Sequence, residues 1–385
     1  MSLRILLCTH VPANDRTAVY RSVSDRAHVL RTKGYVVDVV TADDLMTRRV
    51  PRLDPLLLPI AVAPRVSGYD LVLFHSYLGW TFHLLRRWFD PAKRVKTITS
   101  FHGLEPLYQR ALSDEYKRQG LQLSARYRLL HQVIVPWLLR ASCRRSDALF
   151  CLNTNEVAYV TQHRWADRER VHLASNGVAP ECFVTRVHRP RARRLLFVGQ
   201  WLPAKGIRYL VDAFADLVSR RDVELVCAGT GAPSDVVLSA FPLTARRHVR
   251  VVPTMNREEL YRELVEADLF VFPSLSEGFS CALLEALAAG LPTIATPAGA
   301  AVDVLKHDDN AVIVPFADTR AIVAAVDRLI DDRAQRQHLG SAARSTARRY
   351  TVDKACASFA GEVCAIAMRA NDSQSIAALV GGDAL

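Results

Sequence analysis

The chain has 385 residues, is half hydrophobic and carries a net charge of +11, as expected for a globular protein long enough for two domains. No apolar run approaches the ~18 residues of a membrane-spanning helix. The first run meets His10 and Pro12 too early for a signal peptide, so we expect a cytoplasmic protein. Residues 1–185 hold 26 Lys and Arg against 16 Asp and Glu, whereas residues 186–385 hold 24 against 23. The basic first half favours an anionic partner, and a merely Arg-rich composition is the competing interpretation.

Short apolar runs of strand character alternate with helical stretches along the chain. In the first half they are Arg4–Val11, Tyr35–Ala42, Asp70–His75, Val95–Phe101, Ala148–Asn153 and Val171–Ser175. In the second half they are Arg194–Gly199, Val223–Ala228, Val249–Pro253, Leu269–Pro273, Thr293–Thr296 and Ala311–Val314. Apolar strands that alternate with helices indicate parallel sheets covered on both faces. The sequence therefore predicts two doubly wound, Rossmann-like α/β domains facing a cleft.

The two sets of strands meet at Val184–Arg194, a basic segment that contains Pro190. We predict an N-terminal domain at residues 1–185, a C-terminal domain at 186–355, and a closing helix with a tail at 356–385. The last helix should end near Ala370, with a mobile tail after it.

Eight cysteines are scattered along the chain without a CxxC pair or a Cys/His cluster. Cys8, Cys151 and Cys227 lie within strand-like runs, which favours a role in core packing. The sequence predicts neither a disulfide framework nor a metal site.

The segment FVFPSLSEGFSCALLEALAAGLPTIATPAG, residues 270–299, predicts a strand, a turn, a helix and a second strand. Glu277 precedes the helix and Glu285 lies about two turns into it, so both can face the same space. The helix N-terminus directs N–H groups into that space, which suits an anion. Two hydroxyl acceptors around an anion site fit a sugar attached to a diphosphate. Outside such a frame, two glutamates would be ordinary solvated charges.

This segment resembles the donor-site signature of the GT-B glycosyltransferases, specifically glycosyltransferase family 4. Its Glu, Gly, Phe, Glu, Ala, Gly, Pro and Thr positions are met in order. The resemblance covers roughly Arg4–Ala360, is strongest from Leu195 to Pro315, and implies the GT-B fold with a last helix that crosses back to the first domain. It also implies that Glu277 binds the donor sugar and Glu285 the ribose. The N–H groups of the next residues would bind the sugar and phosphate; these residues are Gly278, Phe279 and Ser280.

The run GQWLPAKG resembles the family's phosphate loop at Gly199 and Lys205, where a Lys reaches the donor diphosphate. A positive charge is needed there because the leaving group is a nucleotide diphosphate. The family usually has Arg after the first Gly, whereas this chain has Gln200, which donates hydrogen bonds without charge. By the same resemblance Gly229 belongs to a glycine turn. The nucleotide base would lie beside two further residues, Thr254 and Met255.

In the first half, TSFHGLEPLY resembles the family's His-Gly turn, which implies that His102 lies near the anomeric carbon and acts with Glu277 and Lys205 as a catalytic group. The family's first loop usually has a Gly-Gly turn, but this chain has no glycine before Gly34. Asn14 can adopt a positive φ and Arg16 can offer charge, so both are candidates on the acceptor side.

The stretch Leu104–Arg145 combines Lys and Arg with Tyr, Trp and aliphatic residues. This composition fits an anionic membrane surface or a lipid-phosphate acceptor, and an ordinary helical face is an equally weighted interpretation. Nucleic acid fits the charge alone and is not expected as a partner.

The resemblance thus implies a retaining glycosyltransferase that moves a sugar from a nucleotide-sugar donor to a saccharide or lipid-linked acceptor, with no cofactor and no metal. Its location would be cytoplasmic, with a peripheral position on the inner membrane face as a further hypothesis. Two alternatives stay open at this point. One is a GT-B epimerase or hydrolase of nucleotide sugars, and the other is a degenerate partner subunit without catalysis.

Overall fold

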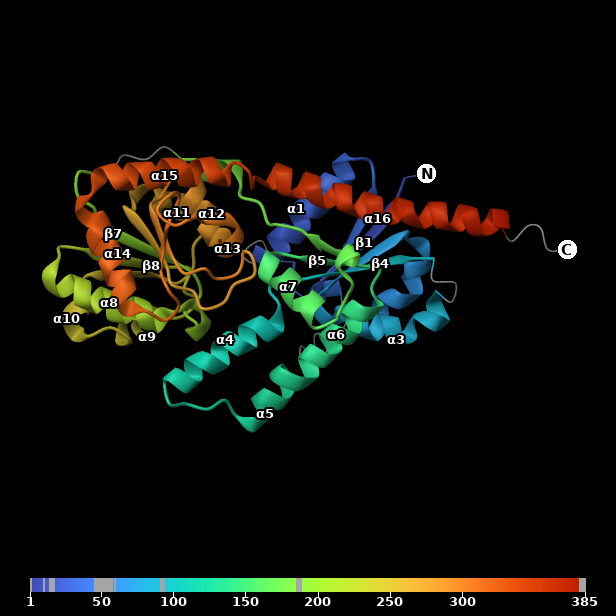
Figure 1. The fold of residues 1–385 in the computed structure, drawn as a ribbon, viewed down its shortest axis with the longest axis horizontal. Helices are drawn as coiled ribbons and strands as arrows, with labels where there is room; N and C mark the ends of the chain where they lie inside the picture. The colour runs from blue at the N-terminus through green and yellow to red at the C-terminus, as the bar shows by residue number, and fades with distance from the viewer. Residues whose placement is uncertain are drawn as a thin grey trace. The chain divides into compact units, whose positions relative to one another are not determined.

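The computed structural model describes residues 2–9, 11–13, 18–44, 58, 60–90, 94–184 and 189–380, with the backbone alone for 369–380. The chain divides into two compact units. The first unit comprises Met1–Glu105, Ala125–Ser175 and Asp353–Leu385, and the second comprises Pro106–Ser124 and Asn176–Val352. Within the described residues each unit contains a six-stranded parallel sheet with helices packed on it (Figure 1). The prediction of two doubly wound, Rossmann-like domains is confirmed.

The sheet of the first unit has the strand order β2-β1-β3-β4-β5-β6. Its strands are β1 (Arg4–Cys8), β2 (Val36–Val40), β3 (Leu71–His75), β4 (Lys96–Ser100), β5 (Ala148–Cys151) and β6 (Val171–Leu173). Its helical elements are α1 (Ala18–Thr32), η1 (Ala42–Asp44), η3 (Ala63–Gly68), η4 (Ser76–Leu78), α3 (Gly79–Phe89), α5 (Ala125–Arg128), the π-helical η5 (Leu129–Ile134), α6 (Val135–Arg145), α7 (Thr154–Gln162), η6 (Arg168–Arg170) and α16 (Val352–Val380). The strand order reverses between β1 and β3, which is where ligands of such sheets bind.

Alternate residues of β1 pack on opposite faces of this sheet. Ile5 and Leu7 pack with α1 and α16, whereas Leu6 and Cys8 pack with η3 and α3. This period of two is the reason that a continuous apolar run forms a strand covered on both sides. Cys151 and Cys227 are also buried in their strands, as predicted.

Helix α16 packs on the first unit through the segment 359–367, and the Arg26 guanidinium lies 4.6 Å from the ring centroid of Phe359. The helix runs to Val380, so its predicted end near Ala370 is wrong. The physical reason is that neither Gly nor Pro interrupts the chain between Ala370 and Val380. In the part of the chain that the structure describes, no helix combines the length and apolarity of a membrane span.

The sheet of the second unit has the order β12-β11-β10-β7-β8-β9. Its strands are β7 (Arg194–Val198), β8 (Glu224–Ala228), β9 (Val249–Val252), β10 (Leu269–Phe272), β11 (Thr293–Ala295) and β12 (Val312–Ile313). Its helical elements are α4 (Glu105–Arg118), which begins at the last residue of the first unit, η7 (Pro180–Cys182), η8 (Pro203–Lys205), α8 (Ile207–Arg220), α9 (Ser234–Ser239), α10 (Leu243–Arg246), α11 (Arg257–Glu266), α12 (Cys281–Ala288), α13 (Ala301–Val304), α14 (Thr319–Asp331) and α15 (Arg333–Ala347). The order reverses between β7 and β10, whose following loops thus flank the switch point of this sheet.

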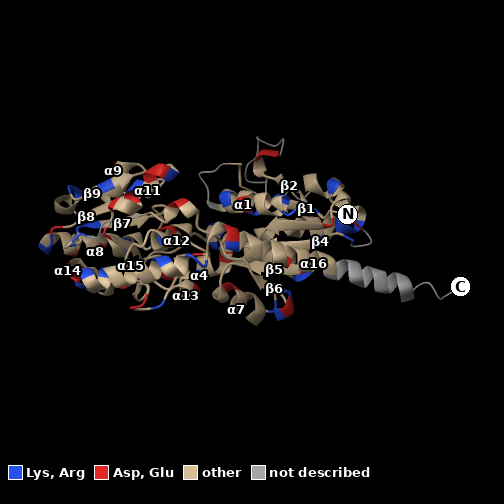
Figure 2. Cartoon of the chain, turned by 90° about the horizontal axis from the view of Figure 1, so that it is seen from above, with Lys and Arg blue, Asp and Glu red and all other residues tan. Residues whose placement is uncertain are grey.

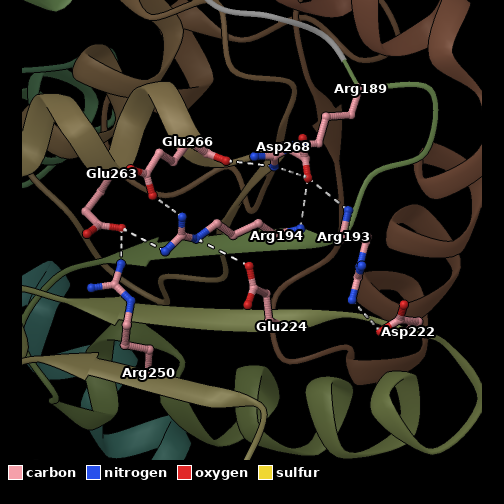
Figure 3. A network of polar contacts seen from close by, with 9 residues as sticks. All are labelled: Arg189, Arg193, Arg194, Asp222, Glu224, Arg250, Glu263, Glu266 and Asp268. Atoms are coloured by element: carbon pink, nitrogen blue, oxygen red, sulfur yellow. Dashed lines mark hydrogen bonds and ion pairs between the residues drawn. The ribbon is translucent and has the colours of Figure 1, made fainter.

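A network of charges joins the amino ends of these strands (Figure 3). The buried Asp268 carboxylate accepts the backbone N–H groups of Arg193 and Arg194, each at 2.9 Å, and pairs with Arg189 at 3.1 Å. The Arg194 guanidinium in turn contacts Glu224, Glu263 and Glu266. Because β7, β8 and β10 are fixed at this edge, the loops at their opposite ends start from defined positions.

Helix α4 lies between β4 and β5 in the sequence but groups with the second unit. Its buried Glu115 accepts a hydrogen bond from the Tyr209 hydroxyl at 2.6 Å, and Ala111 packs against the second core. Burial, together with Glu115, raises the pKa of Tyr209 to about 12. This long-range contact has no local sequence signal.

The carboxylate of Glu156 in α7 is fully buried and ties together two loops of the first unit. It accepts the N–H of Leu104, after β4, at 3.1 Å, and the N–H of Leu152, after β5, at 2.8 Å. The Asn153 side chain caps α7 by accepting the Glu156 N–H. Burial raises the pKa of Glu156 to about 7, against the opposing effect of the two N–H donors.

We predict that Glu156→Gln flattens the pH dependence of stability in the first unit. The pKa of Glu156 is raised from 4.5 to about 7, so its contribution is complete below pH 4.5 and is lost as the pH rises through about 7. The loss is on the order of 3 kcal/mol. Hydrogen exchange of the Leu104 and Leu152 amides between pH 5 and 8 measures it locally.

The matched control is Glu169→Gln, which changes an exposed glutamate of the same unit. The control should keep the decline of the wild type, after correction for intrinsic exchange. An identical decline in Glu156→Gln would show that another group causes it.

Candidate functional site

Two loops meet at the switch point of the second sheet, one after β7 and one after β10. The Ala204 carbonyl accepts the N–H groups of Leu275 at 2.8 Å and Ser276 at 3.3 Å. This backbone contact brings Lys205 beside Glu277, and the ammonium Nζ lies 2.6 Å from the carboxylate Oε1. The hydroxyl of Ser274 donates to the same Oε1 at 2.6 Å. Two residues predicted from separate motifs therefore form one ion pair.

Glycine is required where the loops approach most closely. Gly206 has a φ of +68°, and a Cβ there would overlap the carbonyl oxygen of Pro273. Gly299, after β11, has a φ of +56°, and a Cβ there would overlap the carbonyl oxygens of Glu277 and Gly278. The turn that carries Glu277 is thus packed by glycine backbone from two neighbouring loops.

Helix α12 begins directly after this turn. The Ser280 hydroxyl caps it by accepting the Leu283 N–H at 3.3 Å, and the Asn176 amide donates to the Phe279 carbonyl at 3.2 Å. The helix N-terminus, at Ser280, carries the positive end of the helix dipole. Because the cap and the amide fix the turn, the N-terminus is held beside Glu277.

Glu285 is half-buried in α12, which packs on η7. Its charge adds to the effect of burial on Cys182 and Tyr261, and the pKa of each is raised to about 12. Glu285 therefore lies close to both side chains. It belongs to the helix that follows the Glu277 turn, and its charge acts on Cys182 of η7 and Tyr261 of α11.

The glycine turns after β7 and β8 lie side by side at the carboxyl ends of the strands. The N–H of Gly199 donates to the Ala228 carbonyl at 2.9 Å, and the N–H of Gly229 donates to the Val252 carbonyl at 2.8 Å. A Cβ on Gly229 would lie 3.8 Å from the Met255 methyl group. Gln200 and Thr254 are exposed beside these turns. The predicted donor residues after β7, β8 and β9 therefore share one edge of the sheet.

His102 belongs to the first unit and follows β4. Its ring stacks on that of His75, the last residue of β3, with centroids 4.2 Å apart and planes at 11°. His75 is buried, and the next residue, Ser76, has a φ of +58°, a conformation that non-glycine residues rarely adopt. From the sequence, His75 was predicted only as the end of a strand. The available signal was a polar residue closing an apolar strand next to that of His102.

The remaining predictions concern the acceptor-side candidates and metal binding. Asn14 and Arg16 lie outside the described residues. Among the residues that are described, no group of three His, Cys, Asp or Glu side chains is arranged to hold a metal ion. The site in the second unit contains an ion pair, a helix N-terminus and glycine-rich backbone.

Two family models match the chain, one in each half. The model described as Glycosyltransferase Family 4 matches residues 19–181. The model described as Glycosyl transferases group 1 matches residues 184–346, which include Lys205, Glu277 and Glu285.

Two relatives illustrate the extent of the similarity. The uncharacterized glycosyltransferase YqgM of Bacillus subtilis is 26% identical over 317 residues, which cover 78% of this chain and 86% of YqgM. An uncharacterized glycosyltransferase of Methanocaldococcus jannaschii is 31% identical over 163 residues. That second match covers 42% of this chain and 42% of the relative, so it spans less than half of that protein.

Similarity to solved structures concerns the fold. The Anabaena protein HepE in complex with UDP superposes with a TM-score of 0.69 at 15% identity, covering 94% of this chain and 100% of the HepE chain. The two matched ranges are consecutive, and together they include all the described strands except β1. The chain therefore belongs to the group 1 glycosyltransferases of family 4, which have the GT-B fold.

Proposed function

We propose that this chain transfers a sugar from a nucleotide-sugar donor to a saccharide or lipid-linked acceptor, with retention of configuration and without an essential metal. The observation that carries the proposal is the Lys205–Glu277 pair, with Nζ 2.6 Å from Oε1 at the switch point of the second sheet. A nucleotide sugar offers an anionic diphosphate and several hydroxyl donors. An ammonium group and a carboxylate side by side match both.

The contacts of Glu277 support separate roles for the two residues of the pair, with Glu277 binding the sugar and Lys205 the diphosphate. Lys205 and Ser274 both bind Oε1, which leaves Oε2 to accept a hydroxyl of the donor sugar. Lys205 supplies positive charge for the diphosphate that leaves when its bond to the anomeric carbon breaks. The acceptor hydroxyl oxygen forms the new bond, and its proton goes to the diphosphate product.

The remaining donor contacts follow the sheet edge in this proposal. The turn Gly278–Ser280 presents backbone N–H groups and a helix N-terminus to the phosphates. Glu285 accepts from the ribose, and the nucleotide base lies beside Gly229, Thr254 and Met255. HepE, a structural neighbour, is complexed with UDP, so a uridine nucleotide is the first donor class to test.

On the first unit we assign His102 to the anomeric centre, with the stacked His75 ring restricting its orientation. We further propose that the protein works in the cytoplasm, at the inner membrane face where its acceptor is lipid-linked. The presence of Lys205 and of both glutamates, Glu277 and Glu285, favours transferase activity over a non-catalytic partner subunit.

We predict that Lys205→Ala weakens donor binding while leaving the fold intact. A donor at ~100 times its dissociation constant stabilises the wild type by about 2.7 kcal/mol. A 100-fold weaker variant would retain about 0.4 kcal/mol at the same concentration. Thermal shifts with UDP-, GDP-, ADP- and dTDP-sugars measure the difference.

The matched control for this change is Lys306→Ala, which removes an exposed lysine of the same unit. It should show the shift of the wild type with the same sugar nucleotide. Equal shifts in Lys205→Ala would remove Lys205 from the donor site.

We also predict that His102→Asn lowers kcat by at least ~100-fold with little change in the KM for the donor, because a group at the anomeric centre acts mainly in the transition state. The assay is release of nucleoside diphosphate with a panel of saccharide and lipid acceptors. His28→Asn, an exposed change on α1, serves as the control. An unchanged kcat in His102→Asn would contradict the assignment.

A further inference from the structure

The continuous helix formed by α5, η5 and α6 exposes large apolar side chains over more than two turns. Val133 is 57% exposed and Trp137 is 60% exposed. No residue of the π-helical segment η5 is buried. The exposed apolar residues of this helix are Leu129, Leu130, Val133, Ile134 and Trp137. Such a run costs free energy in water and indicates a surface that is covered in use.

Helix α3 extends this apolar surface. It packs against α6, and the Trp80 and Trp137 ring centroids lie 6.1 Å apart. Leu84 and Trp88 follow Trp80 at intervals of four residues, and both are exposed. We call the exposed residues of the two helices the apolar face; they are Leu84, Trp88, Leu129, Leu130, Val133, Ile134 and Trp137.

The two helices that form the apolar face contain basic residues and no acidic ones. Neither Gly79–Phe89 nor Ala125–Arg145 contains an Asp or a Glu. The longer helix carries five exposed arginines, none of which forms an ion pair with any described residue; they are Arg126, Arg128, Arg140, Arg144 and Arg145. An apolar surface bordered by unpaired positive charge complements an anionic lipid surface.

A basic cavity lies at the end of α6. It has a volume of about 630 Å³. Its lining includes the buried Trp165, four arginines and two acidic residues; the charged residues are Arg144, Arg164, Arg168, Arg170, Asp167 and Glu169. Arg144 follows Trp137 by seven residues, which places both on one side of α6. Arg164 has a φ of +54°, and neither it nor Arg144 has a charged partner among the described residues. The cavity can therefore receive an anionic headgroup beside the apolar face.

We propose that the apolar face and the adjoining arginines dock the first unit on an anionic lipid bilayer. Trp137 and Trp88 suit the membrane interface, and the aliphatic residues of η5 suit the acyl boundary. Nucleic acid is disfavoured because exposed Leu, Val and Ile neither stack on bases nor bind phosphates. Every residue of the surface lies in the first unit, so docking is independent of donor binding at Lys205 and Glu277.

The test is sedimentation of the full chain with vesicles of phosphatidylcholine alone and with phosphatidylglycerol added. We expect binding to the anionic vesicles that weakens between ~0.1 M and ~1 M salt, where the screening length falls from about 10 to about 3 Å. Arg140→Gln/Arg144→Gln should weaken it about 30-fold, from roughly 1 kcal/mol for each arginine. Val133→Ser/Trp137→Ser should also weaken it, but without changing its salt dependence.

Two control variants match these changes in the second unit. Arg262→Gln/Arg333→Gln removes two exposed arginines, and Leu243→Ser removes an exposed leucine. Both should bind vesicles as the wild type does, and all variants should keep its melting temperature and its donor-induced thermal shift.

The proposal is overturned if the wild type binds neither kind of vesicle, or if both surface variants bind like the wild type. Capture by single-stranded RNA without binding to vesicles would also overturn it, in favour of a nucleic-acid surface. A lost donor shift in the wild type alongside intact vesicle binding would contradict the proposed function and leave the docking surface standing.

Discussion

The close approach of Gly206 to the carbonyl of Pro273 is the constraint on which the geometry of the Lys205–Glu277 pair depends. Only a hydrogen atom fits between that α-carbon and that oxygen, because a Cβ would overlap it. The contact allows the Ala204 carbonyl to accept two N–H groups of the facing loop. Lys205 is then held next to Glu277 by backbone geometry rather than by the reach of a flexible side chain. Preorganisation of this kind stabilises developing charge without reorganisation during the reaction.

The sheet order explains why these two loops face each other although more than sixty residues separate them (Lys205 to Glu277). β7 pairs with β10 on one side and β8 on the other, so the loop after β7 lies between the two other loops of the site. At the opposite edge, Asp268 and Arg194 hold the same strands by charge and backbone hydrogen bonds. One edge of the sheet is thus fixed by paired charges. The other edge carries the Lys205–Glu277 pair and the glycine turns of the candidate site.

Local sequence patterns predicted what depends on neighbouring residues. The twelve strands found among the described residues all lie within predicted apolar runs, since a doubly covered strand must be continuously apolar. Lys205 and Glu277 were identified by motifs, yet their pairing was not, because it depends on strand order. Three further features depend on contacts between separate strands or helices. They are the stacking of His75 on His102, the hydrogen bond from the Leu104 N–H to Glu156, and the grouping of α4 with the second unit. A single sequence gives no period or turn signal for such contacts.

The two halves of the chain differ in net charge, and the described residues show that they also differ in how their charges are paired. In the second unit, basic and acidic residues occur together, as around α11 in Figure 2, and Arg220 and Arg221 both pair with Asp327. Paired charges nearly cancel beyond a Debye length. The five arginines of the helix Ala125–Arg145 have no acidic residue in that helix to oppose them, so their field extends into solvent. The same helix exposes Trp and aliphatic side chains, which would favour aggregation if this surface stayed in contact with water. The proposed docking on a bilayer rests on the combination of this field with the apolar face, because an anionic bilayer offers negative charge and an apolar layer at one surface.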